Sequence, residues 1–256
     1  TVHDINYTFS ESDPEGPFTF EIVFTDSAGN EGNPVTTTTN NSLIIFDKTS
    51  PSDFTVGDVV STGGNTVANF WNSTNTGLNI TIPIESDSTL DSGRVQILAK
   101  TGANDFELLG DYTFIASPEV GATKTVSIPG DSVRGITGYA ENDTLIFNAY
   151  IYDIPGNETE GTESTTRLLI DETPPSLISV SYESDFSDSS LATVGHGIIL
   201  TFETDVEIQT PTVTISENTT TVTDLGSNQW QATYTMQDGD EEGIIPFQID
   251  TLTDIR

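Results

Sequence analysis

Acidic and amide side chains are the residues of this chain with the clearest capacity for chemistry. Among its 256 residues are 40 Asp and Glu against 7 Lys and Arg, for a formal net charge of −33. An Asp-x-x-Gly-Asn phrase occurs twice, from Asp26 to Asn30 and from Asp153 to Asn157. Like charges held a few ångströms apart repel one another unless a cation neutralises them, and calcium accepts about six to eight oxygens in flexible geometry. The pattern predicts calcium as the cofactor.

Other cations suit these residues less well. Magnesium prefers strict octahedra and keeps its waters, and zinc favours nitrogen or sulfur, whereas this chain has two histidines and no cysteine. The Asp-x-x-Gly-Asn phrase also has a purely structural interpretation. Asp and Asn would bond to their own backbone while Gly takes a positive φ. Both interpretations remain open from the sequence.

The elements that must position these side chains are β-strands. Apolar residues alternate with polar ones in short runs bounded by Gly, Asn, Asp and Pro, and helical spacing is almost absent. The chain is therefore predicted to be all-β. In the middle of the chain the predicted strands are residues 54–61, 78–84, 94–99, 106–115, 124–128, 145–152 and 167–170. Seven is the strand number of an immunoglobulin-like sandwich.

Internal repeats define the domain organisation. Residues 18–30 return as residues 145–157, and residues 245–254 begin the same phrase a third time. This predicts the C-terminal half of a domain at 1–47, a complete and longer domain at 48–171, and a third domain at 172–256 that lacks its last strand. The first and third share a subtype, because Tyr7 and Asp13 recur as Tyr234 and Asp240, 227 positions later. The sequence is expected to be a piece of a longer array.

Several phrases in the same order resemble a known family. The two Asp-x-x-Gly-Asn phrases, the linkers from Asp47 to Pro51 and from Asp171 to Pro175, and residues 194–202 followed by 210–215 are similar to the tandem bacterial immunoglobulin-like (cadherin-like) repeats of giant surface adhesins. The resemblance covers essentially the whole chain. It implies immunoglobulin-like β-sandwich domains arranged end to end as an extended extracellular rod, on a cell surface or secreted, often stiffened by calcium between domains.

Strand order then predicts which side chains meet at each junction. In such a sandwich, the loops after the second and sixth strands lie at the end where the chain enters. The first junction is therefore expected to gather Asp47, Glu85, Asp87, Asp153 and Asn157, with Asp13 and Glu15 able to approach. The second is expected to gather Asp171, Glu203, Asp205 and Asp254, with Glu141 and Asp143 from the preceding domain. Asp26 and Asn30 form the corresponding turn of the first repeat.

The expected function is a non-catalytic stalk segment whose partners are the neighbouring repeats, with surface glycans or other cells as further candidates. The negative charge argues against nucleic-acid binding, and no apolar run reaches the roughly 20 residues of a membrane span. His3 and His196 lie in different repeats without a hydrolase pattern around them. Two alternatives remain. Trp71, Asn72 and Asn75 could stack and bind a sugar, unless Trp71 instead fills the end of its own sandwich, or the unit could build a filament completed by strand exchange.

Overall fold

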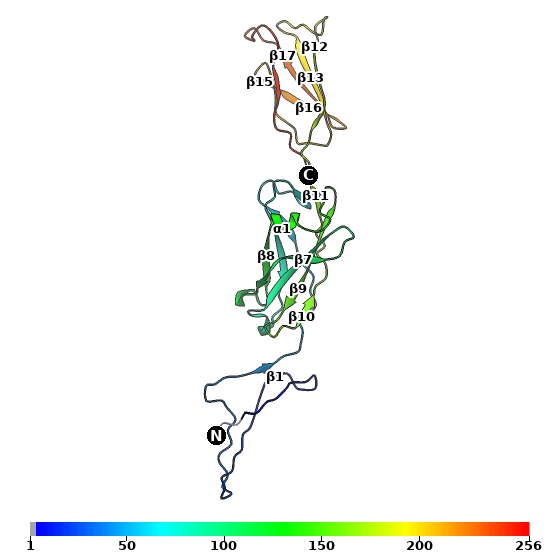
Figure 1. Ribbon diagram of the computed structural model, residues 1–256. Helices are drawn as coiled ribbons and strands as arrows, with labels where there is room; N and C mark the ends of the chain where they lie inside the picture. Colours follow the sequence, from blue (N-terminus) through cyan, green and yellow to red (C-terminus); the bar gives the residue numbers. More distant parts are fainter. Residues whose placement is uncertain (1–3, 256) are drawn as a thin grey trace. The chain divides into compact units, whose positions relative to one another are not determined.

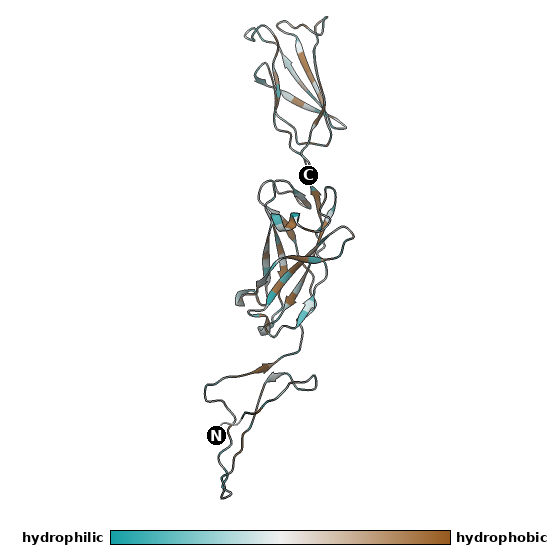
Figure 2. Cartoon of the chain, viewed as in Figure 1, coloured by the Kyte–Doolittle hydropathy of each residue, from teal (hydrophilic) through white to brown (hydrophobic). Residues whose placement is uncertain are grey.

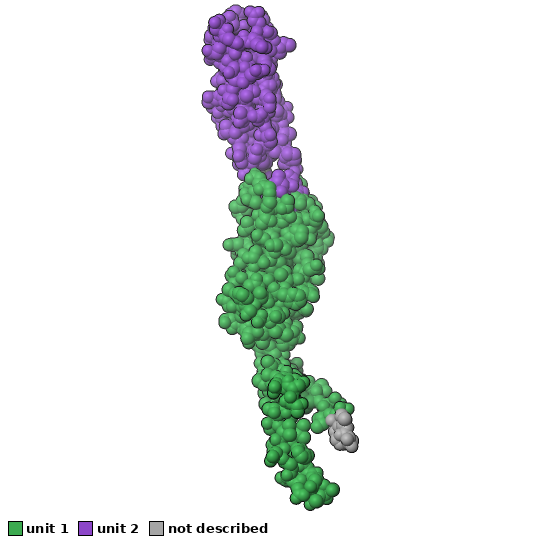
Figure 3. All heavy atoms as spheres, turned by 90° about the vertical axis from the view of Figure 1, so that its left-hand side faces the viewer, with its two compact units in different colours: residues 1–69, 75–169 green, residues 70–74, 170–256 purple. Residues whose placement is uncertain are grey.

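The computed structural model describes residues 4–255 (Figure 1). It is almost entirely β and divides into two compact units, residues 1–69 with 75–169 and residues 70–74 with 170–256 (Figure 3). The strands are β1 (Gly16–Pro17), β2 (Ile45–Phe46), β3 (Val59–Thr62), β4 (Phe70–Asn72), β5 (Gly77–Pro83), β6 (Arg94–Thr101), β7 (Glu107–Phe114), β8 (Thr123–Pro129), β9 (Thr144–Tyr152), β10 (Glu158–Glu160), β11 (Leu168–Asp171), β12 (Leu177–Ser184), β13 (Gly197–Thr204), β14 (Val213–Ile215), β15 (Asn218–Thr219), β16 (Thr221–Gly226), β17 (Gln229–Thr235) and β18 (Phe247–Ile249). The helical turns are η1 (Ser88–Leu90), η2 (Ser117–Glu119) and α1 (Gly130–Arg134).

The middle part of the chain is a sandwich of two antiparallel sheets. One sheet has the order β3-β5-β8, and the other β4-β11-β9-β6-β7, with β10 also paired to β9. The core is formed by apolar residues that alternate with more exposed ones along each strand. In β5, for example, Leu78, Ile80 and Ile82 are fully buried while the residues between them face outward. In Figure 2, apolar residues appear as brown segments of the strands. Counting the seven main strands without β4 and β10, the first, second and fifth lie in one sheet, and the third, fourth, sixth and seventh lie in the other. This is an immunoglobulin-like order.

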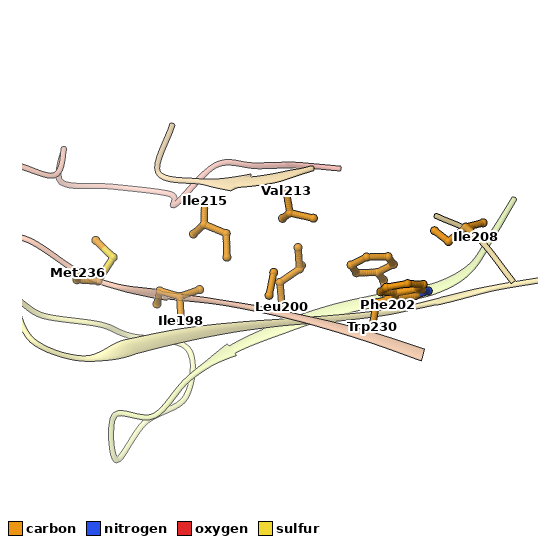
Figure 4. Packing of buried hydrophobic residues seen from close by; sticks show 9 residues of the cluster. Ile198, Leu200, Phe202, Ile208, Val213, Ile215, Trp230 and Met236 are labelled. Atoms are coloured by element: carbon orange, nitrogen blue, oxygen red, sulfur yellow. The ribbon is translucent and has the colours of Figure 1, made fainter. Parts of the chain in front are cut away.

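The third part is also a sandwich of two sheets, but its strand β16 pairs with β17 in the sheet of β12 and β13, whereas the corresponding strand β7 of the middle part pairs with β6 in the other sheet. Its sheets have the orders β12-β13-β17-β16 and β15-β14-β18. Ile198, Leu200 and Phe202 of β13 point between the sheets, where Trp230 stacks at 6.4 Å from Phe202 (Figure 4). The strand β18 pairs with β14 alone among the described residues.

Residues 4–47 form a long hairpin with little regular structure. Its strands β1 and β2 pair over two residues, and isolated bridges join Ile22 to Val35 and Thr25 to Glu31. A two-stranded ribbon with no sheet packed on it is marginal in water. The apolar residues Phe24 and Ile45 are accordingly more than half exposed.

The strands expected in the middle part are confirmed to within a few residues, except that the first begins at Val59 rather than at residue 54. Three short strands, β4, β10 and β15, were not expected from the sequence, nor was α1. Each is only two to five residues long, so none spans enough residues to show a period.

Candidate functional site

The linker residues Ser52 and Ser176 are each held by one carboxylate. The backbone N–H of Ser52 donates to Glu85 Oε1 at 2.5 Å and its hydroxyl donates to Oε2 at 2.6 Å. The backbone N–H and hydroxyl of Ser176 donate to Asp205 Oδ1 and Oδ2, both at 2.8 Å. Each serine follows a linker proline, and each carboxylate follows the second strand of its sandwich. We call each of these pairs a linker clamp.

Glu15 holds the beginning of the first linker. Its carboxylate accepts the backbone N–H of Lys48 at 3.1 Å and the Thr49 hydroxyl at 2.7 and 2.8 Å. The Lys48 ammonium donates to the carbonyl oxygens of Glu11 and Asp13, at 2.6 and 3.1 Å. The hydrogen bond from the Thr49 hydroxyl holds the pKa of Glu15 below its usual value. The first linker is therefore bonded by Glu15 at its start and by Glu85 at its end.

The turn after the sixth strand also contacts this linker. The Asn157 side chain donates to the carbonyl oxygen of Asp47 at 3.4 Å, and the Thr159 hydroxyl donates to that of Pro51. Ile154 N–H donates to Thr89 O at 3.0 Å, which joins this turn to the loop after β5. Linker, second-strand loop and sixth-strand turn therefore lie at one end of the middle sandwich, as strand order predicts.

The Asp-x-x-Gly-Asn turn satisfies its own polar groups. Asp153 is buried, and its Oδ1 accepts the backbone N–H groups of Gly156 and Asn157 at 2.7 Å each, while its Oδ2 accepts the Asn157 amide at 2.7 Å. The earlier copy behaves alike, since Asp26 accepts the backbone N–H and the side-chain amide of Asn30, both at 2.9 Å. Bonding to Asn30 keeps the pKa of Asp26 below its usual value. The self-bonded turn is thus an intrinsic property of the phrase.

The other predicted cation ligands occupy separate positions. Asp87 caps η1 by accepting Thr89 N–H at 2.9 Å, and Asp47 accepts Thr49 N–H at 3.0 Å. Glu203 lies within β13, Asp171 ends β11, and Asp254 forms a bridge with Ile208. Within residues 4–255, no three Asp, Glu or His side chains are grouped so that they could hold a metal ion. The side chains as placed therefore do not form a calcium shell, and calcium at the junctions stays a prediction.

The predicted sugar platform is not exposed. Trp71 is fully buried in β4, which matches the alternative interpretation that it fills the end of its own sandwich. Asn75 is buried as well and donates to the carbonyl oxygens of Gly63 and Asn65, both at 3.0 Å. Asn72 accepts the Thr74 N–H and hydroxyl at 3.0 and 2.7 Å. A ring without an accessible face cannot stack on a sugar, so this group provides no glycan site as it stands.

His196 has a carboxylate partner. Its Nδ1 lies 2.8 Å from Asp185 Oδ1, and its ring packs edge-on against Phe186. This contact keeps the pKa of Asp185 below its usual value. His3 lies outside the described residues.

Only the acidic residue of each linker clamp is among the residues that the sequence predicts at the junctions. The sequence predicts Glu85 and Asp205 as cation ligands at the junctions. It does not predict that they bind Ser52 and Ser176. The signal was available in the Pro-Ser dipeptide that ends each linker, at Pro51-Ser52 and Pro175-Ser176. A serine hydroxyl beside a free backbone N–H is a two-donor group that fits one carboxylate.

No helix in the described part of the chain has the length and apolar character needed to cross a membrane. No protein-family model matches the chain, and no curated protein matches it either. Among solved structures, the chain is similar to a crystal structure of chicken TCR at 13% identity, with 74% of this chain and 89% of that chain covered and a TM-score of 0.27. At that TM-score, the immunoglobulin-like assignment rests on the strand order of the two sheets.

Proposed function

We propose that this chain is a non-catalytic segment of an extracellular stalk, in which tandem immunoglobulin-like sandwiches are joined by linkers that carboxylates hold in one conformation. The observation that carries the proposal is the repetition of the linker clamp, Ser52 on Glu85 and Ser176 on Asp205. A stalk needs joints that resist bending. Two donors on one carboxylate fix the backbone of the residue that carries them.

The first linker shows how such a joint loses its freedom. Asn157 and Glu15 hold residues 47–49 at its start, Glu85 holds Ser52 at its end, and the carbonyl of Pro51 is bonded to Thr159. Pro51 itself restricts φ and removes a donor that would otherwise need a partner. Together these contacts leave few free torsions between residues 47 and 52.

Calcium at the same junctions is a separate part of the proposal. Its support is chemical: acidic side chains are abundant at both linkers, and the net charge favours cation binding. In the structure these side chains accept hydrogen bonds, so bound calcium would have to recruit them away from those donors. The extracellular location likewise rests on the resemblance of the sequence to surface adhesin repeats.

The stiffness of the first joint is testable with spin labels, because the chain has no cysteine. Labels on Thr19→Cys and Thr125→Cys, both exposed, report the distance distribution across the linker by pulsed electron resonance. We expect that the double variant Glu15→Ala/Glu85→Ala broadens this distribution.

A matched control is available within the middle sandwich. Glu107 accepts the backbone N–H and hydroxyl of Thr137, both at 2.7 Å, in the same geometry but away from any linker. Glu107→Ala should leave the distribution width unchanged. Equal widths in the double variant and the unsubstituted chain would contradict the proposal.

A further inference from the structure

The middle sandwich exposes aromatic rings on the outer face of the sheet that contains β7, β9 and β10 (Figure 1). Phe114 of β7 lies opposite Arg94 of β6, and Arg94 lies opposite Tyr152 of β9. This row faces outward, because Val95, the neighbour of Arg94, is buried in the core. The ring of Tyr112 packs edge-on against that of Phe114 at 5.4 Å. We call Arg94, Tyr112, Phe114 and Tyr152 the aromatic face.

The two rings on β7 are open to solvent. Phe114 is 62% exposed and Tyr112 is 49% exposed. Large apolar side chains that gather on a surface, bordered by polar groups, mark a place where a ligand or partner binds. All four members of the aromatic face belong to the complete middle sandwich.

A β-bulge in β7 lies beside the aromatic face. Opposite Gln96 alone, β7 has three residues, Gly110, Asp111 and Tyr112. Gly110 has a φ of 68°, and its carbonyl oxygen accepts the amide of the buried Gln96 at 3.0 Å. The bulge interrupts the pairing groups of β7, which is an edge strand of its sheet. Bulged edges oppose the addition of a further strand, so a ligand is expected on the face of this sheet and not along its edge.

Arg94 is an exposed cation without a carboxylate partner. Its guanidinium carbon lies 4.5 Å from the centre of the Tyr152 ring and 5.3 Å from that of the Tyr112 ring. Within residues 4–255 its side chain forms no ion pair, although acidic residues outnumber basic ones 40 to 7. Lys100 and Lys124, by contrast, each form an ion pair with a glutamate. The two tyrosine rings therefore hold the guanidinium in place and leave its N–H donors available to a ligand.

The charges of the chain favour a ligand with a single carboxylate. A guanidinium binds a carboxylate through two parallel hydrogen bonds. The net charge of −33 disfavours polyanions, and a phosphate group carries nearly two negative charges where a carboxylate carries one. Repulsion of one carboxylate by distant acidic residues is screened within about 8 Å at physiological salt. A cationic ligand is disfavoured as well, because Arg94 already occupies the space between the two tyrosine rings.

The other groups of the surface suit a sugar ring. Phe114 and Tyr112 supply apolar ring surface. On the neighbouring strand, Glu160 accepts the Tyr150 hydroxyl at 3.0 Å and the Asn148 amide at 3.1 Å, and its remaining lone pairs can accept sugar hydroxyls. A pyranose has an apolar C–H face and a rim of hydroxyls, which matches aromatic rings bordered by polar side chains.

We propose that the aromatic face binds a sugar with one carboxylate on a pyranose ring, a uronic or sialic acid, with the carboxylate on Arg94 and the ring against Phe114. This adds a recognition surface to the stalk segment proposed above and does not depend on the linker clamps. The surface is also distinct from Trp71, whose ring is buried.

Side-chain NMR of the full chain tests the site. The chain has four arginines, so the Nε–H signal of Arg94 can be assigned by its loss in Arg94→Gln. The probes are methyl glucuronide and sialyllactose, and their neutral counterparts are methyl glucoside and lactose. We expect both acidic sugars to shift this signal until it saturates. The neutral sugars should bind about tenfold or more weakly, because they lack the charged partner of the guanidinium.

Variants place the binding on the aromatic face, with saturation transfer to the sugar ring protons as the readout. Arg94→Gln should weaken binding of both acidic sugars by about tenfold or more, and Phe114→Ala by about fivefold. Leu108→Ala is the matched control. Leu108 is 67% exposed on the same face of β7, but it lies opposite Leu98, four residues from Arg94, so its replacement should leave binding unchanged.

A peptide probe separates sugars from protein partners. A capped glycine-aspartate-glycine peptide carries one carboxylate and no pyranose, and it should bind more weakly than methyl glucuronide. Binding of this peptide as tight as that of the glucuronide would overturn the assignment to sugars. Amide spectra establish that each variant is folded. The site itself is overturned if folded chain binds neither acidic sugar at millimolar concentration, or if Arg94→Gln binds them as well as the unsubstituted chain does.

Discussion

Ser52 binds Glu85 through both its backbone N–H and its hydroxyl, and so the residue that follows the linker proline is fixed to the loop after β5. The Glu85 carboxylate is half-buried. A neutral variant that keeps one acceptor oxygen and a variant that keeps none should therefore differ in stability.

Glu85→Ala should lower the free energy of unfolding by about 1–2 kcal/mol, because two hydrogen bonds to a charged acceptor are lost. Glu85→Gln should cost less, since its amide oxygen still accepts one donor. Urea denaturation followed by intrinsic fluorescence measures both. Indistinguishable midpoints for the two variants and the unsubstituted chain would show that the clamp does not contribute to stability.

Acidification should remove the contribution of Glu15. The Thr49 hydroxyl bond keeps the pKa of Glu15 below its ordinary value of 4.5, so the folded chain holds this proton less tightly than the unfolded chain does. Its stabilising effect is therefore complete above pH 4.5 and is lost as the pH falls through the folded-state pKa. The melting temperature of the unsubstituted chain should exceed that of Glu15→Gln at pH 7, and the difference should shrink as the pH is lowered below 4.5.

Comparing the two proteins at each pH matters here because acidification also relieves the general repulsion among 40 acidic residues. That repulsion changes almost equally in both proteins, so the difference in melting temperature isolates Glu15. A difference that stayed constant from pH 7 to pH 3 would contradict the assignment.

Calcium should raise the melting temperature of the chain, and chelation with EDTA should reverse the effect, because an ion that binds only the folded state stabilises it. Magnesium at the same concentration controls for general screening of the negative charge. If neither ion nor chelator moves the melting temperature or the small-angle scattering profile, calcium plays no part at the junctions. The linker clamps would then act alone.

Trp71→Ala should destabilise the chain by about 3–5 kcal/mol, as expected for removal of a fully buried large aromatic side chain. Leu108→Ala, at an exposed position of β7, is the control and should cost less than about 0.5 kcal/mol. Guanidinium unfolding curves compare the two. A cost for Trp71→Ala as small as that of Leu108→Ala would show that the tryptophan is not part of the core.

The sequence was sufficient to predict the strands that alternate over seven or more residues. β5, β9 and β13 carry period-two apolar patterns because one face of each lies in a core. β4 and α1 were missed since they are three and five residues long, and the burial of Trp71 and Val133 in them comes from contacts distant in sequence. The strand or helix propensity of a short segment does not depend on such contacts, so it cannot predict them.

Glu85 and Asn157 contact the first linker at the end of the middle sandwich where the chain enters, but the chemistry of these side chains was not predictable from residue type. A carboxylate can bind a cation or accept a hydrogen bond from a backbone N–H. Which of the two it binds depends on whether a donor lies within hydrogen-bond distance of its oxygens. Glu85 meets Ser52, and Asp153 meets its own turn, so neither is left without a hydrogen-bond donor. The three-dimensional position of the donors, and not the type of the acidic residue, decides between cation binding and hydrogen bonding.

The self-bonded turn at Asp26 has a consequence for how such a chain reaches its native state. All of its bonds close within five residues, and the two hydrogen bonds from Asn30 recur from Asn157 in the complete sandwich. Contacts so local form in microseconds, long before strands distant in sequence can meet. Each copy of the phrase should therefore nucleate its hairpin on the nascent chain, setting the register of the two segments that flank the turn before the rest of the sandwich assembles.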